Sequence, residues 1–271
     1  MTALPGLPCA RGCGAPVRWS RWTGRRSTIS DGSVVIHIGL HKTGTRFLQR
    51  AVLRQLDSDR FLVNPEPLYS RLREAARHPG DLQRAEAARL AAAETRPRVG
   101  ERTLVISDPS LSGDMYSSHA GYRDNLGLVA ELFPEARVVY FVRAHADWLQ
   151  SAYRQSLKKG RGQSIERFLN FYEGAFRERA ARMVDGRRNV EALTLSFLDL
   201  YRAYADRFGP ERVYLFRQED LRRRPEEVHS RLAEALGLSE LPPLPGRVSG
   251  NRSFSALAIR LFVAGEDRPS S

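Results

Sequence analysis

Cysteine is scarce in this sequence: the 271 residues contain only Cys9 and Cys13. A C-x₃-C pair without a further cysteine or a matched pair of histidines is a poor zinc site. Residues 31–271 contain no cysteine, so this part of the chain needs neither disulfide bonds nor an oxidising compartment. The sequence also lacks an apolar run approaching the ~20 residues needed to span a bilayer. We therefore expect no metal site, no membrane span and a cytoplasmic location.

Acidic side chains are absent from residues 1–30, which contain five arginines together with several prolines and glycines. No continuous apolar segment follows the first residue, so this region does not have the pattern of a secretory signal. We expect it to be a basic, disordered extension, or the product of a start codon placed too far upstream. The folded domain is then expected over residues 31–271.

The overall composition is that of an ordinary globular protein, with 42% hydrophobic and 27% charged residues. A chain of this length holds one large α/β domain or two smaller ones. The unusual feature is a net charge of +12, with a pI near 10.3. This charge suits an anionic ligand or an anionic surface. Most of the excess is arginine scattered through predicted helices, so a generally basic composition explains it equally well.

The first motif is a strand, a short loop and the start of a helix. Residues 34–38 are an apolar, β-branched run that predicts a buried parallel strand, and apolar residues from Phe47 onward recur at helical spacing. The loop between them contains Lys42, Thr43 and Gly44. Such a unit binds phosphate-like anions, because unpaired backbone N–H groups and the helix dipole converge at one point. Glycine lets the backbone approach the anion, and threonine hydroxyls add donors.

This loop differs from the loop of nucleotide triphosphatases, G-x-x-x-x-G-K-[ST]. Lys42 precedes Gly44, and the hydroxyl that holds Mg²⁺ has no clear counterpart. Residues 39–45, Gly-Leu-His-Lys-Thr-Gly-Thr, resemble the 5′-phosphosulfate-binding loop of sulfotransferases that use 3′-phosphoadenosine 5′-phosphosulfate (PAPS), in a form found in many bacterial members. Arg46 replaces a second threonine of many relatives, and the heparan sulfate branch also has arginine there. The alternative is a chance Gly-Thr turn. The resemblance implies a donor site made by Lys42, Thr43, Gly44, Thr45 and Arg46.

The second motif is an apolar strand at residues 138–142 that ends in Arg143, followed by a predicted helix over residues 145–158. Ser151 lies two turns into this helix. A guanidinium at a strand end and a hydroxyl in the next helix can hold one phosphate between them. This pair resembles the 3′-phosphate-binding element of sulfotransferases, although the family often has Arg-x-Pro where this chain has Arg-Ala-His. The alternative is an ordinary strand–helix unit with a surface arginine, but two matched anion sites in the right order are more specific than either alone.

A third predicted strand, over residues 103–107, ends at Ser107, Asp108 and Pro109. Ligands of open α/β sheets bind outside the carboxyl ends of the strands, so Asp108 is expected to point towards the anion site. In the family this strand ends with a catalytic histidine or with Ser-x-Glu. Here Pro109 occupies the usual glutamate position. The resemblance narrowly favours Asp108 as the general base, whereas a cap of the turn at Pro109 is an equally good interpretation. The fallback bases are His41, Asp114 and His119.

The remaining pattern alternates between helices and strands. We expect helices over residues 68–77, 82–94, 197–208 and 228–236, and strands over residues 61–63 and 212–216. Residues 164–183 are predicted to form one helix, with Phe168, Tyr172 and Phe176 on one face. Such a stripe more often faces the core than a ligand. Glu219 and Asp220 are interpreted as structural carboxylates at a helix start.

A loop rich in proline and glycine spans residues 241–250 and precedes a final predicted helix. Sulfotransferases close the nucleotide site at this place with a loop that is basic or contains asparagine. The resemblance therefore implies that Arg247, Asn251 and Arg252 help to bind the 3′-phosphate.

The resemblance covers residues 33–262 and implies a single α/β domain with a central parallel sheet flanked by helices, similar to P-loop nucleotide triphosphatases. It implies transfer of a sulfuryl group from PAPS to a hydroxyl or amine, with release of adenosine 3′,5′-bisphosphate (PAP). Lys42 and the N–H groups of residues 43–46 would stabilise the charge on the bridging oxygen. Small molecules and glycans are both compatible acceptors, and the Lys-x-Gly-Thr-Arg loop slightly favours a carbohydrate. We expect no nucleic-acid partner and no metal.

Three alternatives remain open at this stage. A nucleotide or small-molecule kinase would need the P-loop lysine and the Mg²⁺ ligands that this loop lacks. A non-catalytic protein that binds anions or nucleic acid would account for the net charge, with salt-dependent affinity for polyanions. A sulfotransferase fold that has lost its activity would account for Pro109.

Overall fold

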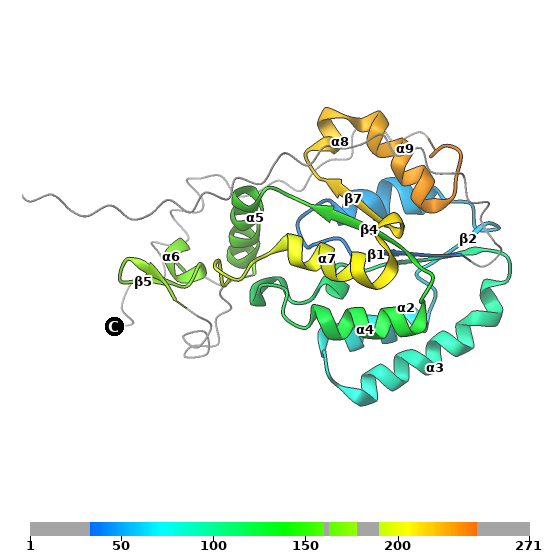
Figure 1. Cartoon of the computed structure of the whole chain (residues 1–271), viewed down its shortest axis with the longest axis horizontal. Helices are drawn as coiled ribbons and strands as arrows, with labels where there is room; N and C mark the ends of the chain where they lie inside the picture. Colours follow the sequence, from blue (N-terminus) through cyan, green and yellow to red (C-terminus); the bar gives the residue numbers. More distant parts are fainter. Residues whose placement is uncertain (1–32, 160–162, 178–189, 243–271) are drawn as a thin grey trace, which may run out of the picture.

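A five-stranded parallel sheet forms the centre of the structure (Figure 1), which is a computed structural model that describes residues 33–159, 163–177 and 190–242. The strand order is β2-β3-β1-β4-β7, and every neighbouring pair is parallel. The strands are β1 (Val34–His37), β2 (Phe61–Val63), β3 (Thr103–Ser107), β4 (Arg137–Val142) and β7 (Val213–Arg217). This confirms the expected single α/β domain. The expected extension at residues 1–30 lies outside the described residues.

The order of the strands creates a change of direction at β1. From β1 the chain runs out to β2, returns through β3, and then crosses to β4 on the other side of β1. The register pairs Ile36 with Ile106 of β3 and with Val138 of β4. The loops that follow β1, β3 and β4 therefore leave the same edge of the sheet. Ligands of open α/β sheets bind at such a point.

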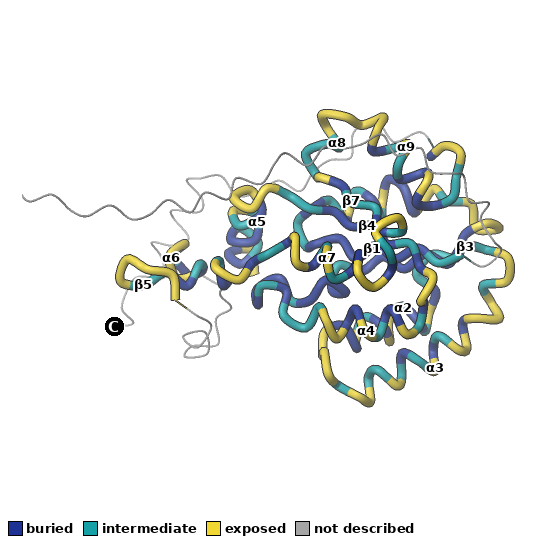
Figure 2. The backbone as a smooth tube through the Cα atoms, viewed as in Figure 1, coloured by how far each residue is buried: buried dark blue, intermediate teal, exposed yellow. Residues whose placement is uncertain are grey.

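Apolar side chains on alternate strand residues build a layer on each face of the sheet. On one face, Val35 belongs to a cluster that includes residues of α9 (Pro225–Leu236). On the other face, Ile36 belongs to a larger cluster with residues of α2 (Leu68–Arg77), α4 (Tyr122–Leu132) and α7 (Phe197–Phe208). Figure 1 shows α8 (Asp220–Arg223) and α9 on one side of the sheet, and α2, α3 (Leu82–Val99) and α4 on the other. In Figure 2 the buried colour follows the central strands, whereas much of α3 is exposed.

Most helices lie where the sequence predicts them. The structure contains α2 (Leu68–Arg77), α3 (Leu82–Val99), α4 (Tyr122–Leu132), α5 (His145–Lys158), α7 (Phe197–Phe208) and α8 (Asp220–Arg223). Helix α3 is longer than predicted and continues through Pro97 in its last turn, where proline removes one backbone donor from the helix. Along the described residues, none of the helices combines the length and apolar character needed to cross a membrane.

The predicted helix over residues 164–183 is wrong as far as residue 177, and residues 178–189 lie outside the described part. A short helix α6 (Ile165–Phe168) is followed by a hairpin of β5 (Phe171–Tyr172) and β6 (Ala175–Phe176), which lies beyond α5 in Figure 1. Its two turn residues, Glu173 and Gly174, both have positive φ, as a tight hairpin turn requires. Phe168 is buried and Phe176 is exposed, so the aromatic residues do not share a face.

Candidate functional site

The loop after β1 has the backbone of an anion-binding loop. Lys42 and Gly44 have positive φ, 70° and 106°, so the chain reverses sharply before the helix begins at Thr45. The Trp148 indole N–H donates to the His41 carbonyl oxygen at 2.7 Å. The loop is thereby anchored to α5. Gly44 is required because a side chain there would adopt a strained left-handed backbone.

The helix that follows this loop is irregular. It starts as α1 (Thr45–Phe47), widens to a π-helical turn η1 (Leu48–Val52) and ends as a 3₁₀ turn η2 (Leu53–Gln55). The wide turn carries Gln49, whose amide donates to the Ser107 carbonyl oxygen at 2.9 Å. The turn therefore connects the loop helix to the carboxyl end of β3, which fits the tendency of π-turns to occur at functional sites.

A buried histidine of β1 supports the start of the loop. His37 Nδ1 and Ser107 Oγ lie 2.8 Å apart, and the His37 side chain is almost fully inaccessible. Burial lowers the pKa of His37 to about 3, so this ring is neutral at ordinary pH. A Cβ atom added to Gly39 would lie 2.2 Å from His37 Nε2, so the loop can follow this path only with glycine at residue 39.

Gly39→Ala is expected to destabilise the protein by about 1–3 kcal/mol, because the new methyl group would overlap a ring that is fixed by burial and by Ser107. Thermal unfolding measures the effect. Gly127→Ala is the matched control, because nothing lies within 4 Å of a Cβ atom at this position in α4. This control is expected to raise the stability by about 0.5–1 kcal/mol, as alanine favours the helix. Equal melting temperatures for both variants would contradict the close approach.

Positive charge gathers at the loop. Lys42 Nζ donates to Gln155 Oε1 at 3.3 Å, and Arg143 Nη1 lies 3.5 Å from the Lys42 carbonyl oxygen. Burial lowers the pKa of Lys42. The neighbouring charges of Arg46, Lys158 and Arg143 lower this pKa further. An anion bound here would relieve the mutual repulsion of these cations.

The two threonine hydroxyls of the loop differ. Thr43 Oγ1 donates to the Leu40 carbonyl oxygen, so its proton is already used inside the loop. Thr45 Oγ1 is buried and has no hydrogen-bond partner among the described residues. A buried hydroxyl without a partner is costly unless a ligand supplies one. The unpartnered Thr45 hydroxyl, together with the cations at the loop, fits a sulfate or phosphate group.

Helix α5 turns one face towards the loop. Trp148 and Gln155 of α5 both contact the loop, and Ser151 lies on the same face because residues three and four apart are neighbours on a helix. The start of α5 is held by Glu219, whose Oε1 accepts a hydrogen bond from the Ala144 N–H at 3.0 Å. The structural interpretation of Glu219 therefore holds, but its carboxylate caps α5 and not its own helix α8.

Asp108 is a structural cap in this structure. It is buried, and its Oδ1 accepts hydrogen bonds from the Ser110 N–H at 2.8 Å and from the Ser110 hydroxyl at 2.5 Å. These bonds start the 3₁₀ turn η3 (Pro109–Ser112). Asp108 Oδ2 lies 3.4 Å from Arg73 Nε. The capping interpretation is therefore what the structure shows, and the carboxylate faces α2 as well as the site.

The two histidine fallback bases come together. The ring centroids of His41 and His119 are 6.4 Å apart. Burial lowers the pKa of His41 to about 4, against the opposing charges of Asp108 and Asp114. Asp114 accepts hydrogen bonds from the Tyr116 N–H and the Ser117 hydroxyl at the start of η4 (Met115–Ser117). Its role in the fold is therefore also that of a cap. Within the described residues, no group of three or more His, Cys, Asp or Glu side chains could hold a metal ion.

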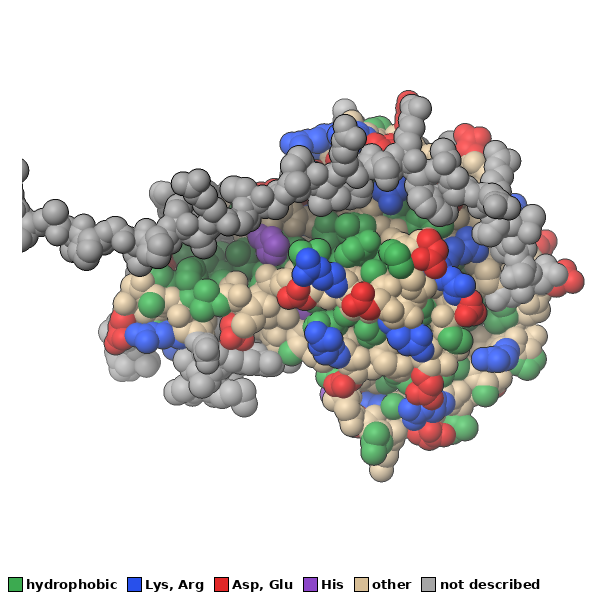
Figure 3. Space-filling model, viewed as in Figure 1, with side chains coloured by type: hydrophobic (Ala, Val, Ile, Leu, Met, Phe, Trp, Pro, Cys, Tyr) green, Lys and Arg blue, Asp and Glu red, His purple; other side chains and the backbone are tan. Residues whose placement is uncertain are grey.

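Charge on the rest of the surface is mixed. On the face shown in Figure 3, basic and acidic side chains are interspersed. Several basic and acidic side chains of the described residues form ion pairs. Arg89, for example, holds Glu131 through two bonds of 2.7 and 3.0 Å. This face does not present the continuous basic stripe that is typical of polyanion-binding proteins.

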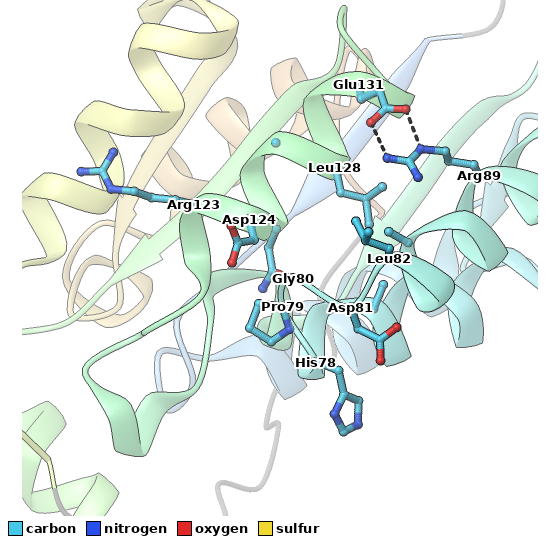
Figure 4. Close-up of a pocket in the computed structure, with 14 residues that line it drawn as sticks. His78, Pro79, Gly80, Asp81, Leu82, Arg89, Arg123, Asp124, Leu128 and Glu131 are labelled. Carbon is cyan, nitrogen blue, oxygen red and sulfur yellow. Dashed lines mark hydrogen bonds and ion pairs between the residues drawn. The ribbon is translucent and has the colours of Figure 1, made fainter.

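A separate groove lies between the α2–α3 turn and α4 (Figure 4). Leu82 and Leu128 belong to its apolar lining, and the Arg89–Glu131 pair lies at one end. It contains none of the residues expected to bind the donor. We therefore place the candidate site at the loop after β1 and not at this groove.

The structure brings several of the predicted site residues to one edge of the sheet: Lys42, Thr45, Arg143 and the face of α5 that contains Ser151. Three further residues contact this site, although the sequence alone gave them no role: Gln155, Trp148 and His37. Gln155 follows Ser151 by one helical turn, which is the signal that could have identified it. His37 gives no such signal, because its role depends on a contact with β3. Arg46 is exposed beside the loop, and Arg247, Asn251 and Arg252 lie outside the described residues.

Comparisons with known proteins agree with this fold. A family model described as the sulfotransferase family matches residues 35–243. A sulfotransferase of known structure from Alicyclobacillus acidocaldarius is 19% identical over 88% of this chain and 93% of its own, with a TM-score of 0.54. A mouse sulfotransferase solved in complex with PAP is 14% identical over 77% of this chain and 60% of its own, with a TM-score of 0.43. No curated protein matches the sequence. Because the family model spans more than half of the chain, this protein belongs to the sulfotransferase family.

Proposed function

We propose that this protein transfers a sulfuryl group from PAPS to a hydroxyl or amine of a small molecule or glycan. The observation that carries the proposal is the loop after β1, where the Arg143 guanidinium lies 3.5 Å from the Lys42 carbonyl oxygen. The Lys42 amine lies at the same loop beside Gln155, and the buried Thr45 hydroxyl has no partner among the described residues. This arrangement offers a site for each anionic end of the donor. A family that transfers sulfuryl groups supports the reaction class.

The 5′-phosphosulfate is assigned to the loop. Lys42, the Thr45 hydroxyl and the backbone N–H groups of residues 43–46 would surround it, with Arg46 adding charge from the exposed side. The 3′-phosphate is assigned to Arg143 and Ser151. Arg247, Asn251 and Arg252 are proposed to complete that end of the site. Binding energy from the 3′-phosphate, far from the reacting sulfur, would then position the sulfuryl group for attack.

Charge moves in the proposed reaction from the acceptor to the leaving phosphate. The acceptor oxygen bonds to sulfur while the bond from sulfur to the bridging oxygen breaks. Lys42 and the loop N–H groups stabilise the charge that grows on this oxygen. His41 takes the acceptor proton. We prefer His41 to Asp108 because Asp108 Oδ1 already accepts two hydrogen bonds. The Asp108 carboxylate instead stabilises the imidazolium that forms on His41.

The donor site is tested by a thermal-shift titration with PAP, adenosine 5′-phosphate and Mg·ATP. At 100 times its dissociation constant, PAP is expected to add about 2.7 kcal/mol and thus raise the melting temperature by about 5–10 °C. The shift should be lost in Arg143→Ala and kept in Arg96→Ala, a matched variant at an exposed arginine of α3.

The other ligands separate the alternatives. A shift with Mg·ATP and none with PAP would support a nucleotide kinase instead. Equal shifts with PAP and adenosine 5′-phosphate, both abolished by moderate salt, would support a non-catalytic anion-binding protein. Binding of PAP without turnover of PAPS, across a screen of glycan and small-molecule acceptors, would support a sulfotransferase fold that has lost its activity.

A further inference from the structure

The segment between η3 and α4 folds tightly around one buried histidine. Ser118 and His119 have positive φ, 50° and 61°. The His119 N–H donates to the Asp114 carbonyl oxygen at 2.9 Å. The His119 carbonyl oxygen would lie 2.3 Å from a Cβ atom at Gly113, so only glycine fits there. Left-handed backbone at two successive residues other than glycine costs free energy, and such strain clusters at functional sites.

Neighbouring groups fix the ring of His119 and its tautomer. The ring packs against Trp148 and Phe197, with centroid distances of 5.6 and 6.1 Å. His119 Nδ1 lies 3.0 Å from the Ser112 carbonyl oxygen, which can only accept. The Ser112 hydroxyl gives its own proton to the Pro109 carbonyl oxygen, so it also can only accept from Nδ1. Nδ1 therefore carries the proton, and Nε2 carries the lone pair.

Two buried imidazole nitrogens lack partners at this place. His119 Nε2 and His41 Nδ1 are both buried without a hydrogen-bond partner among the described residues. The two ring centroids are 6.4 Å apart. Trp148 contacts both histidines, because its N–H holds the His41 carbonyl oxygen while its ring packs on His119. The lone pair of His119 Nε2 needs a donor, and a water molecule that accepts a hydrogen bond from His41 Nδ1–H would supply one.

We propose that His119 is a positioning residue for His41, a role that rests on the sulfuryl transfer proposed above. One water molecule between the rings accepts a hydrogen bond from His41 Nδ1–H and donates one to His119 Nε2. His41 is thereby held in the tautomer with its lone pair on Nε2. This nitrogen takes the acceptor proton as the new bond to sulfur forms. The S–O bond of PAPS breaks in the same step, and its electron pair stays on PAP.

The charged groups around His41 and His119 favour protonation of only one of the two rings. Asp108 and Asp114 lie close enough to His41 to favour its imidazolium, whereas Lys42 and Arg77 oppose it. Burial lowers the pKa of His119 to about 3, so His119 stays neutral while His41 is charged. The proton taken from the acceptor therefore remains on His41 until it is passed to solvent.

The tautomer is tested directly by ¹⁵N NMR of the histidine rings in the whole protein, with His41 assigned through His41→Asn. We expect a protonated Nδ1 and a bare Nε2 on His41 in the wild type. His119→Asn keeps a donor near the Ser112 carbonyl oxygen but removes the acceptor, so His41 should become a mixture of tautomers. His119→Gln offers an amide oxygen near the position of Nε2 and should restore most of the wild-type signal.

Activity provides the second readout. His119→Asn is expected to lower kcat for PAPS turnover by 10–100-fold, with an unchanged KM for PAPS and an unchanged melting shift with PAP. His119→Gln should recover at least part of kcat. A wild-type His41 with a bare Nδ1 would overturn the proposal, even if His119→Asn did not fold. Unchanged tautomer and kcat in a folded His119→Asn would also overturn it. A missing PAP shift in the wild type would instead refute the function and leave the tautomer result to stand by itself.

Discussion

Lys42→Ala is expected to lower the rate of PAPS turnover by about 10³-fold and to leave the fold intact, because the amine stabilises charge that develops only in the transition state. The loss should appear mainly in kcat. The melting temperature should stay the same or rise, since burial and the nearby charges of Arg46, Lys158 and Arg143 already disfavour a charged amine at this place.

Release of PAP from PAPS, measured by ion-exchange chromatography, gives the rate with either an identified acceptor or water. Lys159→Ala removes the same charge from the exposed end of α5 and is expected to keep activity within about threefold. A Lys42→Ala variant with more than a tenth of the wild-type rate would show that the lysine only binds the donor, or that the loop is not the reacting site.

The second large effect is a loss of stability in mild acid. Burial lowers the pKa of His37 and His119 to about 3 and that of His41 to about 4. In the unfolded chain the same side chains bind protons below about pH 6.5. The unfolded state therefore binds more protons than the folded state in this range, so the free energy of unfolding falls as the pH falls. Each histidine contributes a slope of up to about 1.4 kcal/mol per pH unit, and the three together approach about 4.

Urea unfolding at several values between pH 6.5 and pH 5, where few carboxylates titrate, measures this slope. Domains are typically stable by about 5–15 kcal/mol, so a large part of the stability should be gone near pH 5. His119→Asn removes one titrating ring and should reduce the slope by about a third. A flat stability between pH 6.5 and 5 would mean that these histidines are not buried as described.

Periodicity and strand-end chemistry predict much of this protein correctly. The apolar runs gave β1, β2 and β4 to within a residue, and the helical spacing gave α2, α5 and α7. These signals are local, because the hydrophobic period of a buried strand or an amphipathic helix can be recognised in consecutive residues. The helix predicted over the α6–β5–β6 segment was wrong because that prediction also relied on a local pattern. Aromatic residues four apart mimic a helix, whereas the turn at Glu173 and Gly174 decides the fold there.

The site was predicted in part, and what was missed depends on contacts between distant segments. Lys42 and Arg143 stand out because each follows an apolar strand. Gln155 and Trp148 gain their importance only when α5 packs beside the loop after β1. The choice between Asp108 as a base and Asp108 as a cap also could not be made from the sequence, because it depends on where Ser110 and Arg73 lie in the folded chain.

Lys42 and Arg143 are 101 residues apart in the sequence, and they meet because β1 and β4 pair at the centre of the sheet. No continuous piece of the chain shorter than this interval contains both side chains. Contacts of such long range form late, after the entropy of closing a long loop has been overcome. A donor molecule bound by both residues would link the end of β1 to the end of β4 at the centre of the sheet. It would suppress the opening motions that separate β1 from β4, and these are the motions that begin to take the central sheet apart.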